Sequence, residues 1–151
     1  MAVTLADRSV STVGPISDDE FACWIEALGP FEPNPHLAIA LSGGADSGAL
    51  ASLTINWART RGDVNLTALI VDHGLRSSSG HDAARVANYW RVRGVKTVVL
   101  VNPKPRTDTA VEEHARIARW SLLEQWCREN GVLHLLLGHH QDDQAETLLM
   151  R

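Results

Sequence analysis

Residues 36–47 read HLAIALSGGADS, and this stretch decides how the rest of the chain is interpreted. Its first half, residues 36–41, is a nearly continuous apolar run of strand length. Its second half is a series of small residues that contains one aspartate. A strand that is apolar on both faces is typical of a parallel sheet covered by helices on both sides. The stretch therefore predicts a buried strand and a tight loop that opens a helix.

The same alternation continues along the chain. Further apolar runs occupy residues 66–71, 95–101 and 132–137, and segments of helical length lie at 46–61, 79–93 and 109–130. Each of these segments is followed by a glycine, the usual helix stop. Right-handed crossovers commonly arrange four such strands in the order 3-2-1-4. We expect an α/β fold, a three-layer sandwich with a parallel, Rossmann-like sheet of that order.

Two helices carry additional sequence signals. Ser17 and Glu20 have capping-box spacing, so a helix is predicted from there to Gly29-Pro30, as part of an N-terminal appendage. In the segment 109–130, apolar residues recur at three- and four-residue steps and predict a stripe that faces the core. That stripe consists of Val111, Ala115, Ala118, Leu122 and Trp126.

Composition excludes several classes of protein. The chain has 151 residues, 44% hydrophobic and 21% charged, which indicates one folded domain rather than a disordered or fibrous chain. No apolar run is long enough to span a membrane and no signal peptide is recognisable, so we expect a cytoplasmic protein. Cys23 and Cys127 form no CxxC pair, which excludes a disulfide framework, a zinc ribbon and a thioredoxin-type centre.

The net charge of -4 is unevenly distributed. Residues 1–32 contain six acidic residues and one base, Arg8, whereas residues 83–107 contain only bases among their charged residues. Those bases are Arg85, Arg91, Arg93, Lys96, Lys104 and Arg106. Two interpretations stay open, a phosphate-facing surface and a solvated helix face, and the residues alone favour the second.

The order 3-2-1-4 places the reversal of the sheet between the first and fourth strands, where ligands bind. The residues after Leu41 and Leu137 should therefore carry the chemistry. After Leu41 come Ser42, Gly43, Gly44, Asp46 and Ser47. Two glycines and a helix N-terminus predict a phosphate cradle, and a carboxylate beside phosphate implies a bridging Mg²⁺. The alternative is that the aspartate only caps the helix. The loop is neither a Walker A loop nor a dinucleotide fingerprint.

After Leu137 the chain reads GHHQDDQAET, residues 138–147. Asp143 and Glu146 are three residues apart and share one helix face, which suits a metal, a cationic substrate or a general base. The alternative is a solvated acidic first turn. Zinc-ligand spacing is missing, and we reject a zinc site.

Other charged residues have weaker signals. Asp72, His73 and Arg76 follow the second strand at the same sheet edge. Glu112, Arg116 and Arg119 make a charged helix face that ordinary salt bridges would explain.

A rival interpretation treats Ser42 as the nucleophile of a variant elbow, with His139 or His140 as the triad histidine. The chain is short for that fold, and the second glycine lies where an elbow requires little.

Four motifs in this order, SGGADS, VDHGLR, EEHARIARW and LGHHQDDQAETLLMR, resemble the N-terminal catalytic domain of the tRNA(Ile)-lysidine synthase family, which belongs to the N-type ATP pyrophosphatases of the PP-loop superfamily. The resemblance covers about residues 36–151. It divides the chain into an N-terminal extension with one helix, residues 1–34, and a PP-loop ATP pyrophosphatase domain, residues 35–151, truncated at its C-terminal end.

The resemblance implies an ATP-dependent ligase. It would adenylate the C2 oxygen of the wobble cytidine in a tRNA(Ile) with a CAU anticodon, and L-lysine would then displace AMP. It implies that Ser42, Gly43, Gly44, Asp46 and Ser47 hold pyrophosphate. It further implies that Asp46 and Asp143 bind Mg²⁺ and that Asp46, Asp143 and Glu146 are catalytic. His140, Arg116 and Arg119 match further motif positions without an assigned role.

The shortness of the chain relative to this family leads to the expectation of a fragment that folds, and that is inactive or weak alone in modifying tRNA. Alternative functions are another N-type ATP pyrophosphatase, such as a tRNA-thiolating enzyme or an amidotransferase-coupled synthetase, and a non-catalytic nucleotide-binding module. Thiolation would require cysteines in these motifs, and neither cysteine lies in one.

Overall fold

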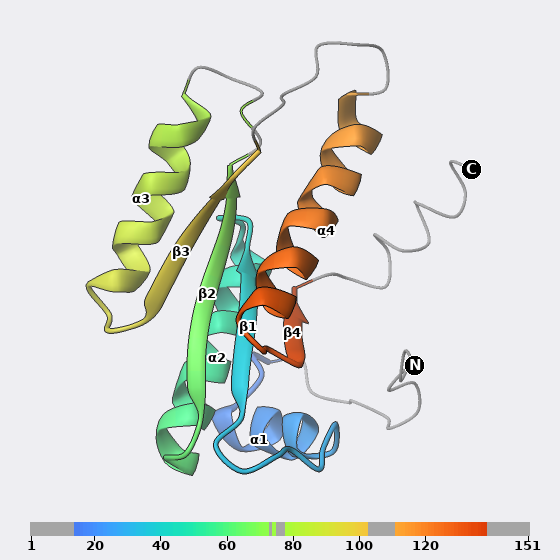
Figure 1. The fold of residues 1–151 in the computed structure, drawn as a ribbon. Helices are drawn as coiled ribbons and strands as arrows, with labels where there is room; N and C mark the ends of the chain where they lie inside the picture. Colours follow the sequence, from blue (N-terminus) through green and yellow to red (C-terminus); the bar gives the residue numbers. More distant parts are fainter. Residues whose placement is uncertain (1–13, 73, 75–77, 103–110, 139–151) are drawn as a thin grey trace, which may run out of the picture.

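The structure is a computed structural model that describes residues 14–72, 74, 78–102 and 111–138. Its helices are α1 (Asp18–Glu26), α2 (Ala45–Arg61), α3 (Ser79–Arg91) and α4 (Val111–Glu129). Its strands are β1 (His36–Leu41), β2 (Asn65–Asp72), β3 (Lys96–Val101) and β4 (His134–Leu137). Helices and strands alternate after α1, and every predicted element is present within a few residues of its expected ends (Figure 1).

The four strands form one parallel sheet in the order β3-β2-β1-β4, as predicted. In this register Leu41 lies opposite Ile70 of β2, and Ala40 lies opposite Leu137 of β4. The carboxyl ends of β1 and β4 are therefore neighbours at one edge of the sheet. This is the point at which the strand order reverses. The connection that follows β1 covers one face of the sheet, and the connection that precedes β4 covers the other.

Successive residues of β1 point to opposite faces, and both faces are buried. Ile39 and Leu41 pack into a cluster with residues of α2 and α3. Ala38 and Ala40 pack into a second cluster with residues of α4. In Figure 1, α4 accordingly crosses one face of the sheet and α2 the other. This burial on both sides is why the strand is a continuous apolar run.

The core stripe of α4 is displaced from its prediction. Leu123 is fully buried and Cys127 is buried, whereas Leu122 and Trp126 are only partly buried. Trp126 still packs against the core rather than standing free, and its ring meets that of His36 edge-on at 6.1 Å. The three- and four-residue spacing identified the helix correctly but centred its buried face on the wrong residues.

Local signals fixed two helix ends as expected. Ser17 and Glu20 form the full capping box, with the Glu20 amide donating to Ser17 Oγ and the Ser17 amide donating to Glu20 Oε2. The Ser17 amide and the Ser17 hydroxyl both donate to the Glu20 carboxylate, which favours its ionised form and lowers the pKa of Glu20. At the far end of α2, Gly62 adopts a left-handed φ of 83° and closes the helix.

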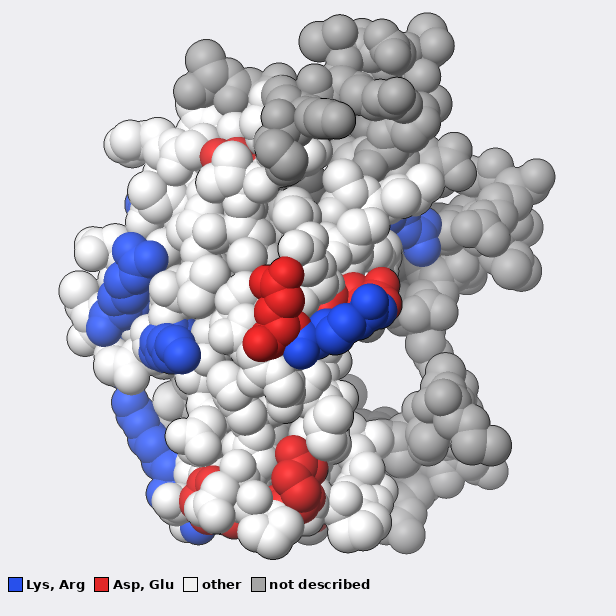
Figure 2. Space-filling view, viewed as in Figure 1, with Lys and Arg blue, Asp and Glu red and all other residues white. Residues whose placement is uncertain are grey.

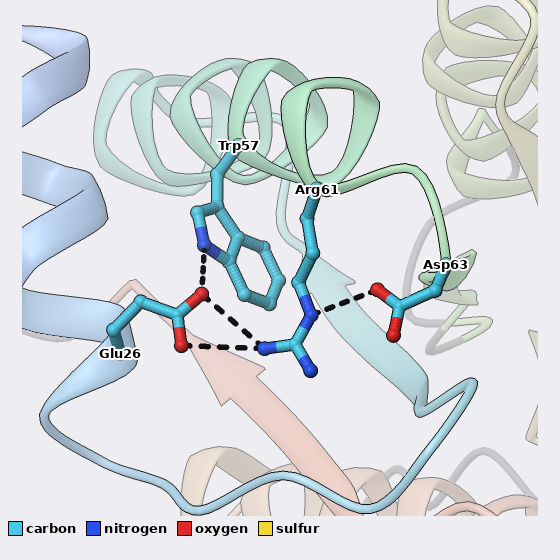
Figure 3. A network of polar contacts seen from close by, with 4 residues as sticks. All are labelled: Glu26, Trp57, Arg61 and Asp63. Carbon is cyan, nitrogen blue, oxygen red and sulfur yellow. Dashed lines mark hydrogen bonds and ion pairs between the residues drawn. The ribbon is translucent and has the colours of Figure 1, made fainter.

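Helix α1 is attached to the end of α2 through both apolar and polar contacts. Phe21 and Ile25 are buried with Trp57 in a third cluster. Glu26 accepts a hydrogen bond from Trp57 Nε1 at 2.9 Å and from Arg61 Nη1 at 3.2 Å, as Figure 3 shows. These contacts join α1 to the body of the sheet, and the boundary predicted at residue 34 stays a prediction. Within the described ranges, no helix is long and apolar enough to cross a membrane.

Candidate functional site

The loop between β1 and α2 lies at the reversal point and is held by its own hydroxyl groups. The Ser47 side chain is buried, and its Oγ accepts from the Ser42 amide at 3.2 Å and donates to the Gly44 carbonyl at 3.1 Å. The two serine hydroxyls are 3.1 Å apart. The Gly44 amide donates to Ser42 Oγ at 3.3 Å. The loop is thus a closed turn that presents its backbone at the surface.

The helix that starts at this loop has a free N-terminus, the feature that favours anions in other helices. Its N-cap is Gly44, and no side-chain hydrogen bond caps this end. The first amides of a helix have no acceptor within the helix, and the helix dipole adds positive potential there. Gly43 has a left-handed φ of 83°, and a Cβ there would lie 3.2 Å from Val86 Cγ2. Glycine therefore meets a conformational and a steric requirement at this position.

Asp46 lies in the first turn of α2 and its side chain is exposed. Carboxylate and hydroxyl oxygens are the ligands that Mg²⁺ prefers, so Asp46 and the neighbouring serines are chemically suited to that ion. Within the part of the chain that the structure describes, no cluster of three or more His, Cys, Asp or Glu side chains could hold a metal. Asp46 is thus the predicted metal ligand that the structure describes, and Asp143, the other predicted ligand, lies outside the described residues.

The residue that follows β4 contacts the loop directly. A Cβ on Gly138 would lie 2.9 Å from the Ser47 amide nitrogen and 3.0 Å from the Asp46 carbonyl carbon. The chain therefore leaves β4 against the backbone of the first turn of α2. Segments nearly a hundred residues apart meet here, as the strand order requires. Asp143 and Glu146, with His139 and His140, lie outside the described residues, and their predicted places stay predictions.

A hollow of about 440 Å³ opens beside the loop, between the ends of β1 and β2 and the start of α3. Its wall includes Ser42, Gly43 and Asp72. Asp72 Oδ1 accepts from the Gly74 amide at 3.0 Å, and Oδ2 lies 3.3 Å from where a Cβ on Gly80 would stand. Asp72 thus lies against both Gly74 and the first turn of α3. His73 and Arg76 lie outside the described residues.

A second hollow of about 380 Å³ continues from the glycines of the loop into the groove between α2 and α3. Gly43 and Gly44 form one end of its wall, and Arg85, Tyr89 and Trp90 of α3 form another part. Sequence reasoning did not place α3 at the site. The available signal was the spacing of Arg85 and Tyr89, which are four residues apart on the helix that follows β2.

On α4, Arg116 is exposed and Arg119 is partly buried. Burial lowers the pKa of Arg119, since desolvation disfavours the charged guanidinium. Glu112 lies in a part of α4 whose side chains are not described, so the expected salt bridges of this face stay a prediction.

Two alternatives can be compared with this geometry. Among the described residues, Asn34 is the non-glycine residue with positive φ, so Ser42 lacks the strained backbone of a nucleophile elbow. Cys23 is exposed on α1, Cys127 belongs to α4 and is buried, and neither lines the two hollows. The loop presents amides and oxygens rather than sulfur.

Comparison with known proteins gives a family and several relatives. The model of the PP-loop domain family matches residues 18–151. The tRNA(Ile)-lysidine synthase of Wolbachia sp. subsp. Brugia malayi is 43% identical over 119 residues, which cover 78% of this chain and 28% of the relative. The enzyme of the same name from Orientia tsutsugamushi is 39% identical over 128 residues, 84% of this chain and 29% of the relative.

A third relative, the tRNA(Ile)-lysidine synthase of Bradyrhizobium sp. strain BTAi1, is 41% identical over 123 residues, 81% of this chain and 34% of the relative. The chain thus spans 28–34% of the length of these relatives. Among solved structures, the U34-tRNA thiolase NcsA from Methanococcus maripaludis with its [4Fe-4S] cluster aligns with a TM-score of 0.72 and 22% identity. That alignment covers 87% of this chain and 48% of the thiolase, and it supports the fold alone.

Proposed function

The chain belongs to the PP-loop domain family, and on that premise we propose that it is the ATP-binding part of a tRNA(Ile)-lysidine synthase. The reaction ligates L-lysine to C2 of the wobble cytidine of a tRNA(Ile) with a CAU anticodon. ATP first adenylates the C2 oxygen and releases pyrophosphate, and the lysine amine then displaces AMP. Identities of 39–43% to relatives of that name support the choice of substrate. A cytoplasmic location belongs to the same proposal.

The observation that carries the ATP half of the proposal is the uncapped helix N-terminus behind the loop of Ser42, Gly43 and Gly44. Backbone amides and the helix dipole stabilise the negative charge that develops on pyrophosphate as it leaves. Because the hydrogen bonds of Ser47 fix the conformation of the loop, its amide donors are already positioned when ATP binds. Preorganisation of this kind lowers the barrier without a reorganisation cost during the reaction.

Asp46 is the residue that would hold Mg²⁺ at the loop, together with phosphate oxygens. The ion would neutralise charge on the leaving pyrophosphate. The hollow beside Asp72 has a volume suited to the nucleoside part of ATP, since ligand pockets commonly measure about 300–1,000 Å³.

Asp143 and Glu146 complete the proposal as the acidic pair near metal, lysine and the activated base. Its support is the contact of Gly138 with the first turn of α2, because Asp143 is the fifth residue after Gly138. Five residues span at most about 18 Å when extended. The Asp143 carboxylate is therefore tethered within reach of the loop.

The alternatives are another PP-loop enzyme and a module that binds nucleotide without catalysis. No cysteine lines the two hollows within the described part of the chain, which favours ligation of an amine over transfer of sulfur.

One experiment tests the proposal. The chain is fused to the remaining segments of the Wolbachia relative and incubated with ATP, Mg²⁺, lysine and the tRNA transcript. We expect pyrophosphate and a lysine-modified cytidine, and Asp46→Asn should abolish both products. Asp19→Asn is the matched control, since Asp19 also lies in a first helix turn but far from the loop.

Pyrophosphate release without modified cytidine would favour another PP-loop reaction. ATP binding without pyrophosphate release would favour the non-catalytic module. Full activity of Asp46→Asn would remove the proposed role of Asp46.

A further inference from the structure

The basic stretch after residue 83 becomes a defined surface in the structure. From the start of α3 to the end of β3 the chain contains four basic residues and one acidic residue, Asp82. The basic residues are Arg85, Arg91, Arg93 and Lys96. Figure 2 shows Lys and Arg side chains gathered along the side of the molecule that α3 and β3 form. A local positive potential of this kind attracts phosphates even when the whole chain is acidic.

Arg93 and Tyr89 form a stacked pair on this side. The guanidinium carbon of Arg93 lies 3.5 Å from the centre of the Tyr89 ring, and Nη1 donates to the Tyr89 carbonyl at 2.9 Å. Arg59 of α2 donates in turn to the Arg93 carbonyl at 3.2 Å. Tyr89 remains 49% exposed. The pair is therefore a fixed, flat, cationic platform at the surface, of the kind on which nucleobases stack.

Arg85 lies one helix turn from Tyr89, on the same side of α3. Its side chain is 75% exposed and forms an ion pair with Asp82 at 3.8 Å. Exposed ion pairs of this type contribute little to stability, so Arg85 can exchange Asp82 for a phosphate at low cost. Its guanidinium is suited to a phosphate of a bound strand.

The second hollow connects this surface to the candidate site. Gly43 and Gly44 of the loop and Arg85 and Tyr89 of α3 line the same groove. A strand with one nucleotide at the loop would pass Arg85 first and then Tyr89 with Arg93.

We infer that the surface formed by Arg85, Tyr89 and Arg93 binds the single-stranded RNA that flanks the nucleotide being modified. This inference rests on the proposed function, because the groove is assigned to RNA only if the loop acts on a nucleotide of RNA. Guanidinium groups alone would also suit an acidic protein. The aromatic platform beside them favours RNA, and unpaired bases are the ones with exposed faces for stacking.

The test measures binding of the complete 151-residue chain to a fluorescent stem–loop with the anticodon-arm sequence of the tRNA(Ile), by anisotropy at several salt concentrations. The variants are Arg85→Gln, Arg93→Gln, Tyr89→Ala and the conservative Tyr89→Phe. Arg128→Gln is the matched control, because Arg128 is 77% exposed and paired within its own helix, but on α4. Circular dichroism melts verify that each variant is folded.

Each of Arg85→Gln and Arg93→Gln should reduce the slope of log K against log salt by about 0.7, the value for one lost phosphate contact to a single strand. Tyr89→Ala should weaken binding roughly ten-fold, while Tyr89→Phe should bind like the unaltered chain. A blunt duplex of equal length should bind more weakly than the stem–loop and respond less to Tyr89→Ala.

The inference is overturned if the unaltered chain does not bind the stem–loop at low salt, or if the three variants bind it like Arg128→Gln. Titration of ATP with Mg²⁺ into the same samples separates this failure from that of the proposed function. If the variants bind both ATP and the stem–loop like the unaltered chain, only the inferred RNA-binding surface is refuted. If the unaltered chain does not bind ATP but its binding to the stem–loop depends on Arg93, only the proposed ATP site is refuted.

Discussion

A hydroxyl buried under the loop holds the candidate site in shape. Ser47 Oγ is engaged by the Ser42 amide and the Gly44 carbonyl, so its main contribution is to the conformation of the loop. The sequence predicted that these residues form one phosphate-binding loop, because two glycines precede a helix N-terminus there. It could not predict which hydroxyl bonds to the backbone, since that depends on distances that only the folded loop sets.

Gly138 is the residue with the least steric freedom at the site. Gly138→Ala should place a methyl group within 3.0 Å of the Ser47 and Asp46 backbone, which cannot yield as a flexible side chain does. We expect a loss of about 1–3 kcal/mol in the free energy of unfolding, typical of overpacking, and weaker ATP binding. Urea denaturation and ATP titration measure the two effects.

The matched control is Gly48→Ala, because a Cβ on Gly48 meets nothing within 4 Å and the residue lies inside α2. Alanine there should stabilise the chain by up to about 1 kcal/mol. Equal behaviour of the two variants would contradict the close contact assigned to Gly138.

Among the helices and strands, α1 is the element whose packing position the sequence predicted least well. Its capping box and length were predictable from local spacing, whereas its docking depends on Glu26 meeting Trp57 and Arg61, more than thirty positions away. Arg61 also donates to Asp63, which lowers the pKa of that carboxyl. The shifted stripe of α4 has a different origin, because helical periodicity identifies a face only to within one residue on either side.

Ile25→Ala tests the docking of α1. Ile25 is 2% exposed, and removing its buried carbons should cost about 2–4 kcal/mol in the free energy of unfolding. Cys23→Ala, on the exposed face of the same helix, should cost less than about 0.5 kcal/mol. Chemical denaturation measures both, and a negligible loss for Ile25→Ala would show that α1 does not contribute to the cooperative core.

The first residue of β1 predicts a dependence on pH. His36 Nε2 lies 2.9 Å from Oγ1 of the buried Thr67 on β2, and burial together with the charge of Lys96 lowers the pKa of His36. The unfolded chain therefore binds the proton at a higher pH than the folded chain does. The contribution of neutral His36 is complete above about pH 6.5 and decreases as the pH falls from there towards the folded-state pKa.

Urea denaturation at pH 7.5 and pH 5.5 measures this effect. The loss of stability between these two values should be smaller in His36→Gln than in the unaltered chain. His81→Gln, an exposed histidine on α3, is the control and should leave the loss unchanged. A loss that is identical in all three chains would assign it to other groups.

In the whole molecule, the candidate site lies at the carboxyl end of the sheet, and the contacts of α1 lie at the opposite end. Helix α2 has 17 residues and is therefore about 25 Å long, with the loop at its first turn and the α1 contacts near its last. The strand order was predictable because crossover handedness leaves few arrangements, and it brought the ends of β1 and β4 together as expected. The groove along α3 was not predictable, since the sequence does not say which face of that helix borders the loop.

This separation predicts how ligand and fold are linked. ATP with Mg²⁺ at about one hundred times its Kd should raise the free energy of unfolding by about 2.7 kcal/mol, because it binds the folded chain and not the unfolded one. Asp46→Asn should remove most of this increment and lower the stability without ligand by no more than about 1 kcal/mol, the usual size of a charge effect in a first helix turn. Ile25→Ala should do the reverse, lowering the stability without ligand and keeping the increment. Denaturation with and without MgATP measures both quantities in each variant. An increment that survives in Asp46→Asn would remove the proposed role of Asp46 in holding MgATP, whereas one lost in Ile25→Ala would mean that α1 shapes the loop through the length of α2.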